Sequence, residues 1–87
     1  MKSAKYFVYL LECRDKSYYC GFTKNIAQRL EAHNLGRGAK YTQARRPVKL
    51  VYSEALRTMK GAMRREIEIK SFSRKEKSVL ISSKFTQ

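Results

Sequence analysis

The stretch FVYLLECRDKSYYCG, Phe7–Gly21, contains the strongest indication of the fold. Aliphatic, aromatic and β-branched residues run from Tyr6 to Cys13, which is the composition of a buried strand. The polar segment Arg14–Ser17 predicts a turn, and Tyr18–Thr23 has the composition of a returning strand. The two strands are therefore expected to pair as a hairpin.

The rest of the chain divides into helices, a loop and one more strand. After the hairpin we expect a helix capped by Thr23 or Asn25 and running to about Asn34, followed by a loop over Gly36–Pro47. A strand over Val48–Ala55 and a helix capped by Thr58, from Met59 to about Phe72, come next. A last helix runs through about Ile81, and a frayed tail covers 82–87. Ser73 and Glu76 have the spacing of a capping box, which marks the start of the last helix. The order ββαβαα predicts a single α+β domain over 1–87, with its core at about 6–81 and a small, at least partly antiparallel sheet.

The chain carries a net charge of +13 over 87 residues, which indicates a polyanionic partner. Nucleic acid is the leading candidate, and anionic membrane surfaces and acidic proteins are the alternatives. The cations are spread along the whole chain instead of along one amphipathic helix, which favours nucleic acid over a membrane. No apolar run is long enough to span a membrane, and Tyr6–Leu11 makes a poor signal peptide, so a cytoplasmic location is expected.

Glu66 occupies an unusual position in the helix that contains GAMRREIEIK, Gly61–Lys70. At about 100° per residue it falls in the middle of an apolar arc, while Glu68 points the opposite way and is expected to be an ordinary solvated charge. That arc consists of Met59, Ala62, Met63, Ile67 and Ile69. An unpaired buried carboxylate is costly, so Glu66 either pairs with a Lys or Arg, or lines a cavity that uses its charge, or lies at the rim of a rotated helix.

Arg29 and His33 lie one turn apart, at the edge of the apolar stripe of the first helix. Arginine can hold a phosphate through two hydrogen bonds, and histidine can move a proton near neutral pH. A magnesium ion needs only one or two protein carboxylates, because phosphate and water complete its shell. Arg29, His33 and Glu66 would therefore suffice for phosphodiester cleavage, although a solvated arginine and a packing histidine are the simpler alternatives.

The loop over Gly36–Pro47 is basic, contains no acid and holds one aromatic residue. Its candidate nucleic-acid-binding residues are Arg37, Lys40, Tyr41, Arg45 and Arg46. The tyrosines of the hairpin are either ordinary strand residues or stacking platforms for bases. Because the turn length is ambiguous by one residue, the sequence leaves open whether Tyr9 and Tyr19 share a face.

Two cysteines, seven residues apart, and one histidine provide too few ligands for a zinc-type site. In the expected cytoplasmic setting, disulfides are rare. Cys13 and Cys20 are therefore expected to be reduced thiols in the two strands of the hairpin.

The hairpin resembles the paired motif of the GIY-YIG nuclease superfamily, with Phe7-Val8-Tyr9 at the first triplet and Tyr19-Cys20-Gly21 at the second. The segments TKNIAQRLEAHN, GRGAKYT, RRPVKLVYSE and the helix that contains Arg65-Glu66 follow in the family's order. The whole pattern, from about Tyr6 to Leu80, is similar to the small stand-alone bacterial proteins of the UPF0213 group.

This resemblance implies a three-stranded antiparallel sheet flanked by helices, with the active site on one face. It implies a metal-dependent endonuclease that hydrolyses DNA phosphodiester bonds with Mg²⁺ or Mn²⁺. Arg29 would bind the scissile phosphate, Glu66 would bind the metal, and His33 would transfer a proton or contact phosphate. Tyr9 and Tyr19 match the motif tyrosines, and one of them, with Tyr19 preferred, would position or deprotonate the attacking water.

The chain departs from the pattern at Phe22, where the excision-repair branch of the superfamily has a lysine thought to assist the base. The general base implied here is therefore a tyrosine or His33, and a tyrosine would need nearby cations to act at neutral pH. Homing, repair and restriction relatives choose their targets through additional domains. Only a basic surface and the loop from Arg37 to Arg46 are expected to do so here.

The sequence is compatible with three functions. The first is an endonuclease acting on single-stranded or branched DNA in repair or recombination. The second is a nucleic-acid-binding module with weak or no catalysis, and the third is a recruiting protein for an acidic partner. The presence of all five motif residues favours the first over the second. Nine Lys or Arg against one Glu between Arg37 and Arg65 favour both over the third. No heptad pattern predicts a coiled coil, so a monomer is expected, with salt-sensitive binding and limited sequence readout.

Overall fold

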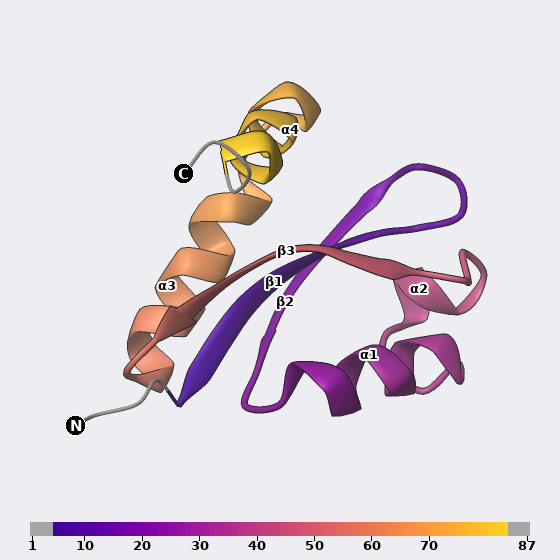
Figure 1. Ribbon diagram of the computed structural model, residues 1–87, viewed down its shortest axis with the longest axis horizontal. Coiled ribbons are helices and arrows are strands. Elements are labelled where there is room, and N and C mark those ends of the chain that lie inside the picture. Colours follow the sequence, from indigo (N-terminus) through magenta and orange to yellow (C-terminus); the bar gives the residue numbers. More distant parts are fainter. Residues whose placement is uncertain (1–4, 84–87) are drawn as a thin grey trace.

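The computed structural model describes residues 5–83. Its elements are, in order, β1 (Tyr6–Glu12), β2 (Tyr18–Thr23), α1 (Ile26–Asn34), α2 (Lys40–Gln43), β3 (Lys49–Leu56), α3 (Met59–Lys70) and α4 (Arg74–Ser83) (Figure 1). This is the expected order with one addition, α2, which lies in the segment predicted to be a loop. The last helix also includes Ser82 and Ser83, which were assigned to the frayed tail. The rest of that tail, 84–87, and positions 1–4 of the predicted domain lie outside the described residues.

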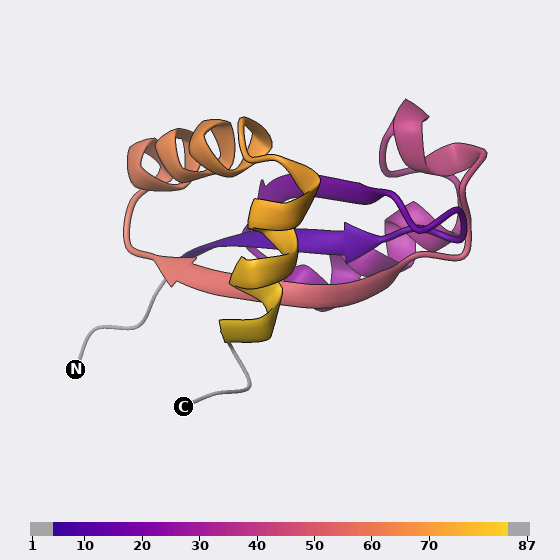
Figure 2. The same ribbon diagram turned by 90° about the horizontal axis from the view of Figure 1, so that it is seen from above.

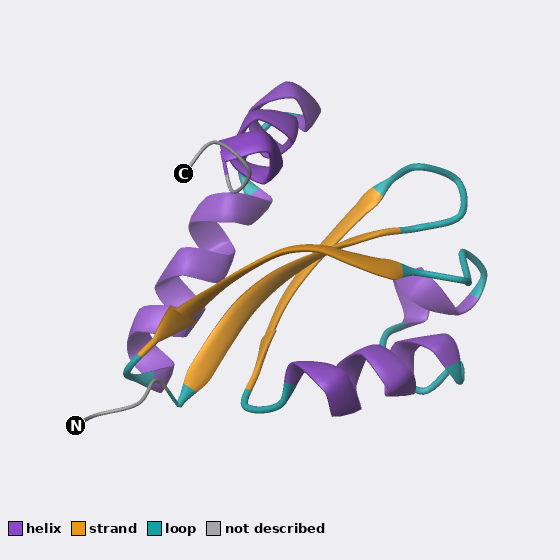
Figure 3. Cartoon of the chain, in the orientation of Figure 1, coloured by secondary structure: helices purple, strands orange, loops and turns teal. Residues whose placement is uncertain are grey.

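The three strands form one antiparallel sheet in the order β2-β1-β3, so β1 is central and β2 is an edge strand (Figure 3). In the hairpin, Tyr9 pairs with Gly21 and Leu11 pairs with Tyr19. Directly paired residues project to the same face, and the faces alternate along each strand. Tyr9 and Tyr19 therefore share a face, which answers the question that the sequence left open.

Each face of the sheet has its own apolar cluster. The first cluster, under α3 and α4, has the buried residues Val8, Leu10, Cys20, Ala62 and Ile69. The second, on the side of α1, has the buried residues Tyr9, Leu11, Cys13 and Val48, with Tyr19 and Leu30 packed against it. Figure 1 shows α3 on one side of the strands and α1 with α2 on the other. In Figure 2, α4 turns away from the end of α3 and runs past β3.

Side-chain caps begin three of the helices. The Asn25 side chain accepts from the Gln28 amide, and the Thr58 hydroxyl accepts from the Gly61 amide. At α4, Ser73 and Glu76 bond each other's amides, which confirms the predicted capping box. None of the helices within residues 5–83 has the length and apolar character needed to cross a membrane.

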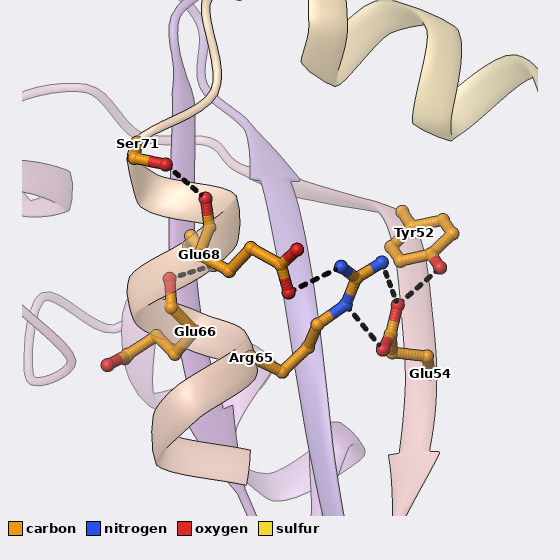
Figure 4. A network of polar contacts seen from close by, with 7 residues as sticks. Tyr52, Glu54, Arg65, Glu66, Glu68 and Ser71 are labelled. Atoms are coloured by element: carbon orange, nitrogen blue, oxygen red, sulfur yellow. Dashed lines mark hydrogen bonds and ion pairs between the residues drawn. The ribbon is translucent and has the colours of Figure 1, made fainter. Parts of the chain in front are cut away.

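A polar network attaches α3 to β3 (Figure 4). The Arg65 guanidinium donates to both Glu54 oxygens, at 2.8 and 3.2 Å, and to Glu68 at 2.9 Å. The Tyr52 hydroxyl donates to Glu54 at 2.5 Å. The two carboxylates raise the pKa of Arg65, which therefore stays charged. Glu68, expected to be an ordinary solvated charge, is thus paired although its side chain remains largely exposed.

Replacing Arg65 by Met should lower the free energy of unfolding by about 1–3 kcal/mol, because the half-buried Glu54 carboxylate loses its charged partner. Urea denaturation followed by circular dichroism measures the change. Arg64→Met, on the exposed surface of the same helix, is the matched control and should change stability by less than about 0.5 kcal/mol. Equal stability of the two variants would contradict a stabilising role for the network.

Candidate active site

Tyr9 extends from the central strand across the edge strand, and a glycine makes room for it. Its side chain is buried, and the residue that faces it on β2 is Gly21. A Cβ atom at Gly21 would lie 2.6 Å from the Tyr9 hydroxyl oxygen, well inside van der Waals contact. The glycine of the second triplet is therefore needed so that the Tyr9 hydroxyl can lie over β2.

His33 lies in the last turn of α1, and its buried ring faces this hydroxyl. The Tyr9 hydroxyl and His33 Nε2 are 3.0 Å apart, which is hydrogen-bonding distance. The Tyr19 ring meets the His33 ring edge to face, with centroids 5.2 Å apart. On the other side of His33, the chain passes so close at Gly38 that a Cβ atom there would overlap Nδ1. His33 is therefore held by both motif tyrosines and by the backbone after α1.

Arg29, one turn before His33, completes this group. Its Nη2 donates to the Gly38 carbonyl at 3.0 Å, and its guanidinium interacts with the Tyr9 hydroxyl. The Arg29 side chain is only half-buried, so it can also reach an incoming anion. Tyr9, Tyr19, Arg29 and His33, which we call the tyrosine–histidine cluster, are thus brought together on the α1 side of β2.

The pKa shifts of Tyr9 and His33 both favour the neutral side chain. Burial raises the pKa of Tyr9, and the hydrogen bond and charge of Arg29 only partly oppose this effect. Burial and the positive charge of Arg29 both lower the pKa of His33. Near neutral pH, Tyr9 therefore keeps its proton and His33 has a free lone pair, so the pair is prepared for proton transfer from oxygen to nitrogen.

The cluster continues to the surface as a stack of side chains. Tyr41, on α2, stacks on Tyr19 with ring centroids 6.1 Å apart, and the Arg45 guanidinium lies 3.9 Å from the Tyr41 ring centroid. Arg45 also pairs with Asp15 at 3.0 Å and donates to the Tyr41 carbonyl. Arg45 forms the outer end of this stack, and both its side chain and Tyr41 are partly exposed, so the stack could meet a base there.

The predicted nucleic-acid-binding cations fall into two groups. Arg45 takes part in the stack, and Arg46 donates to the carbonyls of Gln43 and Asn34, so both also hold the loop in place. Arg37 and Lys40 are exposed. The loop therefore combines two cations that organise it with two that face the solvent.

Glu66 is set apart from the cluster. It lies on α3, which covers the opposite face of the sheet, over Cys20 of β2. Its carboxylate pairs with Lys70 at 3.7 Å, and its side chain is 18% exposed, so it is accessible from solvent. Figure 4 shows it pointing away from the Arg65 network. The expectation of a site on one face therefore needs correction, because Glu66 and the cluster lie on the two sides of the edge strand.

The position of Glu66 follows from the rotation of α3. Ala62 and Ile69 face the sheet, while Met59, Met63 and Ile67 are exposed at 47, 46 and 66%. The buried arc is thus displaced from the apolar arc of the sequence, and Glu66 lies at its rim. Two of the alternatives considered for Glu66 therefore hold together: it is at the rim of a rotated helix, and it pairs with a lysine.

A divalent cation at Glu66 would need ligands from outside the protein. Within residues 5–83, no three His, Cys, Asp or Glu side chains are close enough to form a protein cage for a metal. One accessible carboxylate still fits Mg²⁺ or Mn²⁺ when phosphate and water supply the other ligands. This single carboxylate therefore fits a metal ion whose coordination shell is completed by the substrate and water.

Sequence reasoning missed Thr42, which is fully buried against His33. It belongs to GRGAKYT, but no local pattern distinguished it from the other polar residues of the predicted loop. The two cysteines are free, as expected, and project to opposite faces. Burial and the charge of Glu66 raise the pKa of Cys20 to about 11, which makes it a poor nucleophile.

The lowered pKa of His33 predicts a specific pH dependence of stability. The unfolded chain protonates its histidine near pH 6.5, whereas the folded protein does so only at lower pH. The unfolded state therefore binds more protons in between, and folding stability should decrease as pH falls below about 6.5. Because the chain has one histidine, an NMR titration reports His33 alone and should give a midpoint below 6.5. His33→Gln should lose this part of the pH dependence, and a midpoint at or above 6.5 would contradict the assignment.

Known proteins resemble this chain in sequence and in fold. The model of the GIY-YIG catalytic domain family matches residues 5–78. A UPF0213 protein of Staphylococcus haemolyticus is 51% identical over 81 residues, which cover 93% of this chain and 99% of that protein. A UPF0213 protein of Syntrophus aciditrophicus is 53% identical over 79 residues, covering 90% of this chain and 91% of the relative.

Two solution NMR structures share the fold. The UPF0213 protein of Bacillus halodurans is 44% identical, with a TM-score of 0.60 over 91% of this chain and 84% of that one. A protein from E. faecalis is 35% identical, with a TM-score of 0.63 over 99% of this chain and 91% of that one. The family model, the relatives and the three-stranded fold agree, and the chain therefore belongs to the GIY-YIG family, in which it is similar to the UPF0213 proteins.

Proposed function

We propose that this chain is a metal-dependent endonuclease that hydrolyses phosphodiester bonds in DNA. The family match to a nuclease-type catalytic domain supports nuclease activity in general. The single observation that carries the proposal further is the direct contact between the Tyr9 hydroxyl and His33 Nε2, with Arg29 beside them. A proton acceptor and a phosphate-binding cation at one position are what hydrolysis of a phosphodiester requires.

In the proposed mechanism, the Tyr9–His33 pair acts as the general base. A water molecule gives a proton to the Tyr9 oxygen while Tyr9 passes its own proton to His33 Nε2. The water oxygen then bonds to phosphorus as the bond to the leaving oxygen breaks. We favour this pair over Tyr19, because the Tyr9 hydroxyl has a bonded acceptor and the Tyr19 ring packs between His33 and Tyr41.

Arg29 and Glu66 would bind the two sides of the reacting phosphate. Arg29 uses one N–H on Gly38 and keeps others for phosphate oxygens, where its charge opposes the charge that develops in the transition state. Glu66 would hold Mg²⁺ or Mn²⁺ after giving up Lys70. When bound, such an ion polarises the phosphate and stabilises the leaving oxygen. A phosphate at the free edge of β2 would lie between the two residues.

The proposed substrate is single-stranded or branched DNA, as in repair or recombination, bound by a monomer. The net charge of +13 supports binding to phosphates, which provides affinity with little sequence readout. The exposed end of the Tyr19–Tyr41–Arg45 stack supports contact with unpaired bases, since stacking requires an open base face.

A binding module with weak or no catalysis is the second candidate. The pairing of Glu66 with Lys70, on the face opposite Arg29, favours it. If the substrate does not draw Glu66 away from Lys70, the protein would bind DNA and would not cut it.

Nicking assays on single-stranded, duplex and branched DNA with Mg²⁺ or Mn²⁺ test the proposal. Glu66→Ala and Arg29→Ala should each reduce the cleavage rate by roughly 100-fold or more, because each removes a group that stabilises the transition state. Glu66→Ala should keep most DNA binding. Chelation of the metal should abolish cleavage, and binding should weaken steeply as salt is raised.

Glu68→Ala and Arg64→Ala are the matched controls, since both lie on α3 and are exposed. They should cleave within about 3-fold of the unmodified protein, as expected for changes away from a site. If the unmodified protein binds every substrate and cuts none, the proposed endonuclease activity is refuted. If Glu66→Ala cuts as fast as Glu68→Ala, the assignment of Glu66 as the metal ligand is refuted. The first of these results would establish the binding module.

A further inference from the structure

We propose that Thr42 is a positioning residue that fixes the tautomer of His33. It holds the proton on Nδ1, and so leaves the Nε2 lone pair free to accept the proton of Tyr9. The importance of this tautomer for cleavage rests on the proposed function, whereas the tautomer itself is a property of the free protein.

The Thr42 hydroxyl contacts two groups. Its Oγ1 lies 2.9 Å from His33 Nδ1 and 3.0 Å from the carbonyl oxygen of Ala39. A carbonyl oxygen can only accept, and two oxygens at this distance attract each other only with a hydrogen between them, so we place the one hydroxyl hydrogen between Thr42 and the Ala39 carbonyl, which also accepts from the Thr42 and Gln43 amides. The contact with Nδ1 then requires a hydrogen from the ring. We therefore infer that His33 is protonated at Nδ1.

The role of the other ring nitrogen, Nε2, follows from this tautomer. A neutral imidazole with its proton on Nδ1 has an acceptor at Nε2. The Tyr9 hydroxyl, 3.0 Å away, must be the donor in that contact. The burial and the Arg29 charge that lower the pKa of His33 keep the ring neutral, which this arrangement needs. Tyr9, His33, Thr42 and Ala39 thus form a chain of hydrogen bonds with one direction.

The surroundings shield the His33–Thr42 end of this chain from competing water. The side chains of Tyr9, His33 and Thr42 are all buried, and among the described residues no buried side-chain nitrogen or oxygen lacks a partner. Thr42 lies in the short helix α2, and Ala39 is the N-cap residue of that helix. The hydroxyl that accepts from His33 and the carbonyl that accepts from Thr42 are therefore held three residues apart in one turn. The fold therefore provides a fixed acceptor for Nδ1.

The opposite tautomer would reverse the chain. With the proton on Nε2, His33 would donate to the Tyr9 oxygen and could not receive a proton from it. In the proposed mechanism, the Tyr9 O–H bond breaks as a new Nε2–H bond forms, and the resulting imidazolium keeps its Nδ1–H bond to Thr42. Thr42 thus acts on the reaction through His33 and touches no reacting atom.

NMR of protein labelled with ¹⁵N at histidine tests the inference directly, because the chain has one histidine. Two-bond ¹H–¹⁵N spectra, recorded well above the ordinary histidine pKa of about 6.5, distinguish the tautomers. The unmodified protein should show protonated Nδ1 and unprotonated Nε2. Thr42→Val, nearly the same shape without the hydroxyl, should lose this pattern and show a substantial population of the Nε2–H form. Thr42→Ser should restore the pattern.

Cleavage provides the second measurement. Thr42→Val should lower kcat by roughly 10–100-fold, as removal of a group that orients a catalytic histidine does, with KM little changed. Thr42→Ser should recover most of the rate. An Nε2–H spectrum in the unmodified protein, or identical spectra for it and a folded Thr42→Val, would overturn the inference. If the expected spectra appear but the unmodified protein never cuts DNA, the tautomer assignment is supported and the proposed function is refuted.

Discussion

The hydrogen bond between the Tyr9 hydroxyl and His33 Nε2, buried on the α1 side of the sheet, is the interaction around which this small domain is arranged. A buried hydroxyl or imidazole is costly unless it is bonded, so the pair determines what can surround it. Gly21 must lack a side chain so that Tyr9 can cross β2, and Gly38 must lack one so that the loop can pass His33. Residues distant in sequence therefore meet because two polar groups require each other.

The edge strand connects the two parts of the candidate site. Tyr19 and Cys20 are neighbours on β2 and therefore project to opposite faces, toward α1 and toward α3. The tyrosine–histidine cluster lies on one side of the strand, and Glu66 lies over Cys20 on the other. Since no strand of residues 5–83 lies beyond β2, its free edge is where an extended polyanion could contact both sides. The Arg65 network lies on the β3 side of α3, and Glu66 points away from it.

The features of this fold that depend on neighbouring residues were predictable from the sequence, and those that depend on contacts between distant residues were not. The Asn25 cap and the Ser73–Glu76 capping box are set by groups a few residues apart, so sequence patterns identified the box and limited the first cap to Thr23 or Asn25. The hairpin register depends on a turn that is ambiguous by one residue, and the rotation of α3 depends on which side chains the sheet accepts. Thr42 could not be recognised, because its partner His33 lies nine residues away across a loop. The motif resemblance identified Tyr9 and Glu66 as candidates but could not show that they lie on opposite faces.

The direction of the hydrogen-bond chain also limits which group can act as a base. Hydroxyl groups and imidazole rings can reverse their roles, so a chain made only of these groups would have two equivalent states. The Ala39 carbonyl cannot reverse, because it has no hydrogen to give. Placed at the end of the chain, it assigns a role to each member before it, from Thr42 through His33 to Tyr9. The positive charge of Arg29 opposes protonation of His33 while it favours negative charge on Tyr9, so the electrostatics act in the same direction as the hydrogen bonds. In the proposed mechanism, one backbone oxygen and one guanidinium would thus direct proton transfer from oxygen toward nitrogen in this cluster.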